Sequence, residues 1–212
     1  MSSSHQTKTR SSRRLLKKLG KRLQKVLRQN QDQVDRYKQV RYWCQDESRI
    51  GLITLWARKL TAKGIQPVGI EQWCFDYLWL YGLVEPRSGA SFFAEFSHVD
   101  GVCFQQYLDW FSQAYPKQLH LIQLDNGRWH IWSELNVPDN VILVFQPPYC
   151  PQVNPIERLW KEIKKHLKWE LFDNLDRLRQ KLSKVLSRLT CSTIASITGW
   201  DFILDALFVA NI

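Results

Sequence analysis

The chain has 212 residues, of which 44% are hydrophobic and 13% aromatic. This size and composition suit one folded domain with an appendage, and exclude a disordered chain or two full-sized enzymatic domains. Five cysteines without a CxxC pair argue against a zinc finger or a disulfide framework. The apolar runs are shorter than the roughly 18 residues of a membrane span, and the N-terminus lacks a signal-peptide centre. We therefore expect a soluble, cytoplasmic protein.

The net charge of +10 is concentrated at the N-terminus, because residues 1–30 contain no Asp or Glu. Apolar residues recur there at helical spacing, at Leu15, Leu16, Leu19, Leu23, Val26 and Leu27. The pattern predicts a basic amphipathic helix within a leader over residues 1–38. Three interpretations remain open for it: a clamp on DNA phosphates, a membrane-surface helix and a solvated leader. The clamp would use Arg13, Arg14, Lys17 and Lys18.

From Val40 the pattern becomes typical of strands. In VRYWCQ, residues Val40, Tyr42 and Cys44 alternate with Arg41, Trp43 and Gln45, and further apolar runs follow at residues 50–56, 75–84 and 91–96. Turn-forming stretches such as EPRSGA separate some of these runs, which indicates antiparallel strands.

The second half alternates helix and strand. Helical spacing follows Gly101 and ends near Pro116, strands are predicted at 119–124 and 141–145, and an apolar segment covers 129–135. The proline-rich QPPYCPQVNP is expected to be extended, a helix to run from Asn154 to about Trp169, and one long helix to cover 171–189. The last helix is predicted to pack on the core, with dimerisation as the alternative. This order predicts an α/β domain with a mixed sheet.

Three acids occur at expected element ends: Asp46 after the first strand, Asp125 after the strand at 119–124, and Glu157 in the first turn of the helix from Asn154. Strand ends of one sheet lie close together and are common ligand sites. Three oxygen ligands without a thiolate or an imidazole suit Mg²⁺ or Mn²⁺.

Each acid also has a purely structural interpretation. Asp46 can be a solvated turn residue, and Asp125-Asn126-Gly127 is a good turn sequence. Glu157 can support a helix start in which Asn154 is the N-cap and Pro155 the first helical residue. Spacing alone leaves the metal site and these interpretations open.

Three strings together resemble the DDE transposases of the mariner-related bacterial insertion sequences. They are QDESRIGL around Asp46, LIQLDNGRWH around Asp125 and QPPYCPQVNPIERLWKEIKK around Glu157. The resemblance implies a ribonuclease H-like mixed sheet flanked by helices, here with a basic N-terminal helix. It places the catalytic domain at residues 39–170 and a packed helical extension at 171–212.

The resemblance also implies metal-dependent cleavage and strand transfer of an insertion sequence. Asp46, Asp125 and Glu157 would hold two Mg²⁺ or Mn²⁺ ions, which activate water or a DNA 3′-hydroxyl and stabilise the leaving oxygen. The implied partner is double-stranded DNA, as transposon ends and TA-containing targets, with a homodimer as a further option. The protein would be bacterial and would associate with the nucleoid when bound to DNA.

Neighbouring residues take supporting roles in this interpretation. Asn126, His130 and Asn154 are candidates for orienting an acid or contacting DNA, although Asn126 also suits a turn and His130 a structural site. The cations on the Glu157 helix are either a phosphate-contacting ridge or a solvated face, and comprise Lys161, Lys164, Lys165 and Lys168. Trp129, Trp132 and Trp160 are expected in the core.

Two features depart from the family. Cys150 stands where the family has Ser, and fewer than 40 residues precede Val40, where the family carries helix-turn-helix modules. We therefore expect an upstream-frame partner polypeptide or a remnant with a surviving active site. Two alternative functions remain. One is a catalytically idle, truncated transposase that binds DNA or inhibits the full-length transposase, and the other is a stand-alone ribonuclease H-like nuclease.

Overall fold

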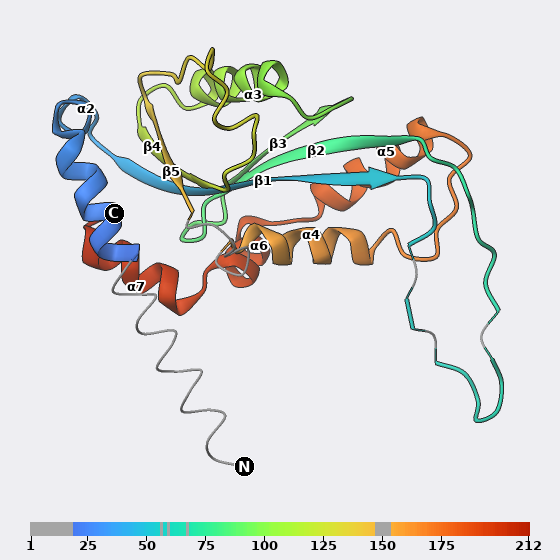
Figure 1. Cartoon of the computed structure of the whole chain (residues 1–212). Coiled ribbons are helices and arrows are strands. Elements are labelled where there is room, and N and C mark those ends of the chain that lie inside the picture. Colours follow the sequence, from blue (N-terminus) through green and yellow to red (C-terminus); the bar gives the residue numbers. More distant parts are fainter. Residues whose placement is uncertain (1–18, 56, 59, 67, 147–153) are drawn as a thin grey trace.

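The computed structural model describes residues 19–55, 57–58, 60–66, 68–146 and 154–212, and Figure 1 shows their arrangement. Residues 19–29 are helical. The named elements that follow are α2 (Gln31–Arg36), β1 (Val40–Gly51), β2 (Tyr77–Val84), β3 (Ser91–Phe96), α3 (Gly101–Ala114), β4 (Leu119–Leu124), β5 (Val141–Phe145), α4 (Ile156–Lys165), α5 (Leu175–Ser187), α6 (Cys191–Thr198) and α7 (Asp201–Ala210).

The strands form one mixed sheet in the order β3-β2-β1-β4-β5. β1 pairs antiparallel with β2, which pairs antiparallel with β3, whereas β4 runs parallel to both β1 and β5. The predicted mixed α/β sheet is confirmed. The apolar segment expected at 129–135 forms turns, so it adds no strand.

The first strand differs from the prediction, because β1 continues through the two acids Asp46 and Glu47 to Gly51. Asp46 therefore lies inside a strand and not after one, and no separate strand covers residues 50–56 among those described. The two carboxylates do not end the strand because each finds a partner on its own side of the sheet. Asp46 accepts a hydrogen bond from Trp160, and Glu47 accepts one from Gln45.

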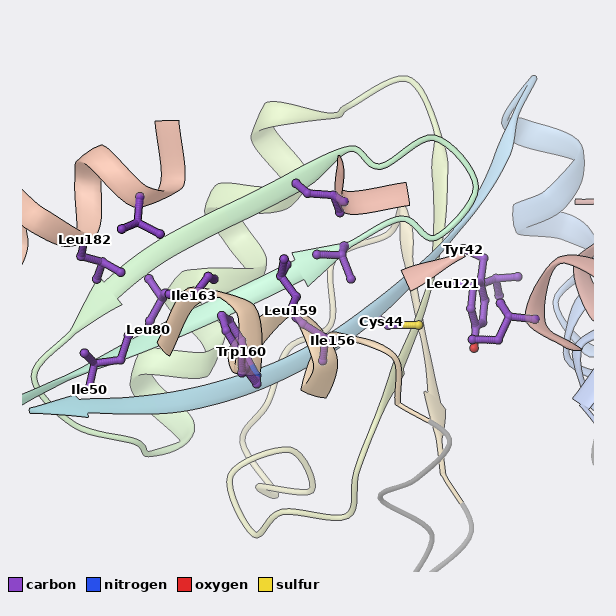
Figure 2. Close-up of a cluster of buried hydrophobic side chains, with 14 of the residues drawn as sticks. Tyr42, Cys44, Ile50, Leu80, Leu121, Ile156, Leu159, Trp160, Ile163 and Leu182 are labelled. Carbon is purple, nitrogen blue, oxygen red and sulfur yellow. The ribbon is translucent and has the colours of Figure 1, made fainter. Parts of the chain in front are cut away.

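Helices cover both faces of the sheet, with α3 on one side and α4 on the other (Figure 1). The α3 side is an aromatic core that includes Trp43, Tyr81, Phe104 and Tyr107, all fully buried. The α4 side is the larger core. Figure 2 shows Ile156, Leu159, Trp160 and Ile163 of α4 packed between Cys44 and Ile50 of β1 and Leu80 of β2. Ile156, Leu159 and Ile163 form the buried stripe of α4, and Leu167, just beyond the end of the helix, is buried as well.

The helix predicted at 171–189 is present as the shorter α5, and two further helices, α6 and α7, follow it in the C-terminal region. α5 begins at its N-cap Asn174, which accepts from the amide of Arg177, and α6 begins at Thr190, which accepts from the amide of Thr193. Leu171, expected on the helix face, precedes α5 and is exposed. The side chain of Thr190 caps a new helix, which explains why the pattern breaks after Leu189.

No single described helix is long and apolar enough to cross a membrane. Only α6 and α7 taken together pass that test by length and composition, and they meet at a bend of 94°.

Candidate active site

Asp46 lies at the centre of the sheet on the α4 side. Its Oδ2 accepts a hydrogen bond of 2.8 Å from Nε1 of Trp160. Burial, assisted by the negative charges of Glu47 and Glu157, raises the pKa of Asp46 to about 7. Asp46 and Glu157 thus lie close together, and the charge of Glu157 disfavours ionisation of the buried Asp46 unless a cation is present.

The opposite residue on β2 makes room for this contact. Gly82 is the register partner of Asp46, and a Cβ added to it would lie 2.5 Å from Cη2 of Trp160. Only a glycine lets the indole lie against β2 and still reach the carboxylate. Trp160 is buried as expected, and it also holds Asp46 in place.

Glu157 is in the first turn of α4, as predicted. The alternative in which Asn154 caps this helix is wrong, because Pro155 is the N-cap and no side chain caps the helix. Asn154 instead donates from Nδ2 to the carbonyl of Gln45, at 2.8 Å in a buried position. This bond fastens the start of α4 to β1 one residue before Asp46. The helix also ends earlier than predicted, at Lys165, and Trp169 has a positive φ of 61°.

Lys164 lies near both of these acids. Burial lowers its pKa, while the charges of Glu157 and Asp46 act in the opposite direction. Its neighbours Lys161, Lys165 and Lys168 are exposed and, with Arg158, line a hollow of about 500 Å³ between α4 and α6. The predicted cation ridge therefore has two parts, one lysine beside the acids and three on an outer surface.

Asp125 follows the last residue of β4, as predicted. β4 and β1 are in parallel register, with Cys44 opposite Gln123. Continuing this register by two residues would set Asp125 beside Asp46. In the structure the Asp125 carboxylate turns back, because its Oδ1 accepts from the amide of Gly127 and from Nδ1 of His130, both at 2.8 Å.

His130 is buried and bridges two acids. Its Nδ1 contacts Asp125, and its Nε2 lies 3.1 Å from Oε1 of Glu47, whose side chain is 4% exposed. Burial opposes the charged ring, but the hydrogen bonds to Asp125 and Glu47 outweigh it and raise the pKa of His130 to about 9. The hydrogen bond to His130 lowers the pKa of Asp125. Trp129 Nε1 is also placed to donate a hydrogen bond to Nε2 of His130, and His130 accepts this bond only when its ring is neutral. The two carboxylates favour the charged form.

The remaining predicted residues lie around this site. Asn126 does not contact Asp125 through its side chain amide, which donates to the carbonyl of Gln146 at 2.9 Å and joins the ends of β4 and β5. His130 is 1% exposed and therefore supports the site from inside instead of facing DNA. Arg13, Arg14, Lys17, Lys18, Cys150 and most of the proline-rich string lie outside the described residues.

The carboxylates of Asp46, Asp125 and Glu157 do not converge closely enough to form a preassembled metal site. Among the described residues, three ligand atoms of His, Cys, Asp or Glu come within 4.8 Å of one another at His98, Asp100 and Cys103. Asp100 there is the N-cap of α3. At the active site Asp46 and Glu157 share one region, while Asp125 lies at the adjacent strand end and is held by His130.

The sequence profile of the DDE superfamily endonucleases matches residues 41–179, more than half of the chain. The chain belongs to this family. A protein of Sinorhizobium fredii described as uncharacterized, y4pE/y4sA, is 31% identical over 86 residues, which cover 40% of this chain and 64% of that protein.

Two solved structures show the same fold. The catalytic domain of Mos1 mariner transposase has a TM-score of 0.58 at 13% identity, with 93% of both chains covered. The Mos1 strand transfer complex has a TM-score of 0.62 at 15% identity, covering 92% of this chain and 61% of that chain. The chain therefore spans less than two thirds of the longer proteins that it matches. The predicted DDE family and ribonuclease H-like fold are confirmed.

Sequence reasoning missed three residues of this site. Trp160 follows Glu157 by three positions, so the two side chains are neighbours on the helix surface. This spacing could have indicated that Trp160 lies near the acids. Glu47 was visible only as part of an acidic pair. Gly82 carries no local signal, because its role depends on the register between β1 and β2.

Proposed function

We propose that this chain is the catalytic part of a transposase that cleaves and joins DNA with divalent metal ions. The observation that carries the proposal is the closeness of the buried Asp46 to Glu157, with Asp125 directly after β4, the strand that runs parallel to β1. Family membership and the Mos1-like fold support it.

The donor set fits a hard divalent cation. Asp46, Glu157 and Asp125 supply carboxylate oxygens, which suit Mg²⁺ or Mn²⁺. Mos1 complexes with Mg and with Mn have been solved, which supports the same metals here. Two such ions, when bound, would activate the attacking hydroxyl or water and stabilise the leaving oxygen.

The chain's own residues would organise this chemistry. Trp160 and Asn154 fix Asp46 and the start of α4, so that Glu157 stays near Asp46. His130 holds Asp125 in its ionised state and would release or redirect it toward the other acids when substrate and metal bind. Lys164 lies close enough to both acids to offset negative charge from a scissile phosphate.

A cleavage assay tests the proposal. The purified chain is incubated with labelled duplex DNA that carries a nick or a hairpin end, in Mg²⁺ or in EDTA. We expect nicking that requires Mg²⁺ and is lost in Asp125→Ala. Metal-dependent nicking that survives Asp125→Ala overturns the proposal.

The same assay separates the alternatives. Cleavage of an RNA–DNA hybrid but not of duplex DNA would identify a ribonuclease H-like nuclease. Duplex binding without cleavage under any metal would identify an idle, DNA-binding fragment.

A further inference from the structure

The helix at residues 19–29 is part of the domain. Leu23 is fully buried, and Gly20 lies so close to α7 that an added Cβ would be 3.1 Å from Cγ1 of Val209. Gln24 donates from Nε2 to the carbonyl of Val209 at 2.8 Å. The described part of the basic N-terminal segment is therefore held in a defined position, in contrast to a solvated leader.

A second contact ties this helix to the catalytic edge of the sheet. The guanidinium of Arg22 donates to the carbonyl of Phe145, the last residue of β5. Phe145 is the register partner of Leu124, and Asp125 comes next in the chain. Figure 1 shows the helix running from this edge toward α2.

The outer face of the helix carries a row of cations. Lys21, Lys25 and Arg28 are exposed and, being four and three residues apart, lie along one side of the helix. With Gln24 and Gln29 they line a hollow of about 420 Å³ that contains no acidic residue. Within the described part of the chain no ion pair involves these three side chains. We call them the basic row.

We infer that the basic row binds the phosphate backbone of the DNA duplex that is engaged at the acids; this rests on the proposed function. A row of uncompensated cations in a polar hollow complements a polyanion. Arg22 fixes the row relative to the strand ends that carry Asp125. An anionic membrane surface fits less well, because a surface helix inserts its apolar face, and Leu23 of that face is buried in the domain.

The test measures duplex binding in EDTA, so that no cleavage occurs. Binding of a labelled duplex to the full chain is followed by fluorescence anisotropy over a range of salt concentrations. In Lys21→Gln/Lys25→Gln/Arg28→Gln the slope of log affinity against log salt should become shallower by about 2 to 3, at roughly 0.9 per phosphate contact.

A charge-matched control separates a specific contact from net charge. Lys117→Gln/Lys184→Gln/Arg188→Gln removes three exposed cations elsewhere and should leave the slope unchanged. Equal slopes in the wild type and the basic-row variant overturn the inference, as do equal losses in both variants. Loss of binding to phosphatidylserine vesicles with unchanged DNA binding overturns it in favour of a membrane role.

Failure of this inference and failure of the proposed function give different results. Nicking that depends on Asp125 together with an unchanged salt slope overturns the basic row alone. A reduced slope without any nicking supports the row and overturns the catalytic proposal.

Discussion

The indole Nε1 of Trp160 lies 2.8 Å from Oδ2 of Asp46, and this hydrogen bond joins the helix of the third motif to the strand of the first. Trp160→Phe removes the donor and keeps most of the ring. We expect metal-dependent cleavage to fall about 10- to 100-fold, as for other groups that orient metal ligands, with about 1 kcal/mol lost in stability. Single-turnover cleavage and urea unfolding measure the two effects. An unchanged cleavage rate would show that Asp46 needs no such support.

Gly82→Ala should act on the same bond from the other side. The new methyl group would lie 2.5 Å from the indole of Trp160, so the ring must move away from β2 and from Asp46. Cleavage should fall as far as in Trp160→Phe, and the double variant should lose little more than either single variant. Additive losses in this cycle would mean that the two residues act separately.

Asp46→Asn should stabilise the metal-free protein at high pH. The pKa of Asp46 is raised to about 7 from 3.8. In EDTA, the stability that the protonated Asp46 contributes is therefore fully present below pH 4 and is lost as the pH rises through 7. At pH 8 the variant should be more stable by on the order of 2 kcal/mol, since the group is partly exposed. At pH 4 the two proteins should match. Unfolding curves in EDTA measure this, and a pH-independent difference would contradict it.

Asn154→Ala should reduce both stability and activity. It removes the buried bond to the carbonyl of Gln45, which costs about 1 to 3 kcal/mol, and it frees the start of α4. The control is Asn174→Ala, which removes the N-cap of α5 at about 1 kcal/mol. Only the first variant should lose cleavage when both are assayed well below their unfolding temperatures.

His130→Leu should leave Glu47 buried without its ionic partner. Breaking a buried pair in this way costs about 3 to 5 kcal/mol. Glu47→Gln in the same background should recover part of the loss, because it removes the uncompensated charge. If the second change adds a further loss of stability, the bridge between Glu47 and Asp125 does not contribute as the structure indicates.

Patterns local in sequence were sufficient for much of this fold. The alternation at residues 40–45 and the buried LHLIQL strand follow from side-chain periodicity, and Glu157 in the first turn follows from helix-start preferences. The extension of β1 beyond Asp46 could not be predicted in this way. The two acids are accommodated in the strand by hydrogen bonds to Trp160 and His130, which are more than 80 residues away in the sequence. The capping alternative for Asn154 failed for the same reason: capping is a local pattern, whereas the side chain of Asn154 donates to the carbonyl of Gln45 on another element.

The unbroken path of β1 through Asp46 and Glu47 has a wider effect. Successive residues of a strand face opposite ways, so Asp46 meets α4 through Trp160, whereas Glu47 meets His130, whose ring packs on Phe104 of α3 with centroids 4.5 Å apart. Asp46 and Glu47, two adjacent residues of β1, thereby couple the α4 side of the sheet to its α3 side. Substitutions on the α3 side, remote from Asp46, should therefore change the position of the Asp46 carboxylate through Glu47 and β1.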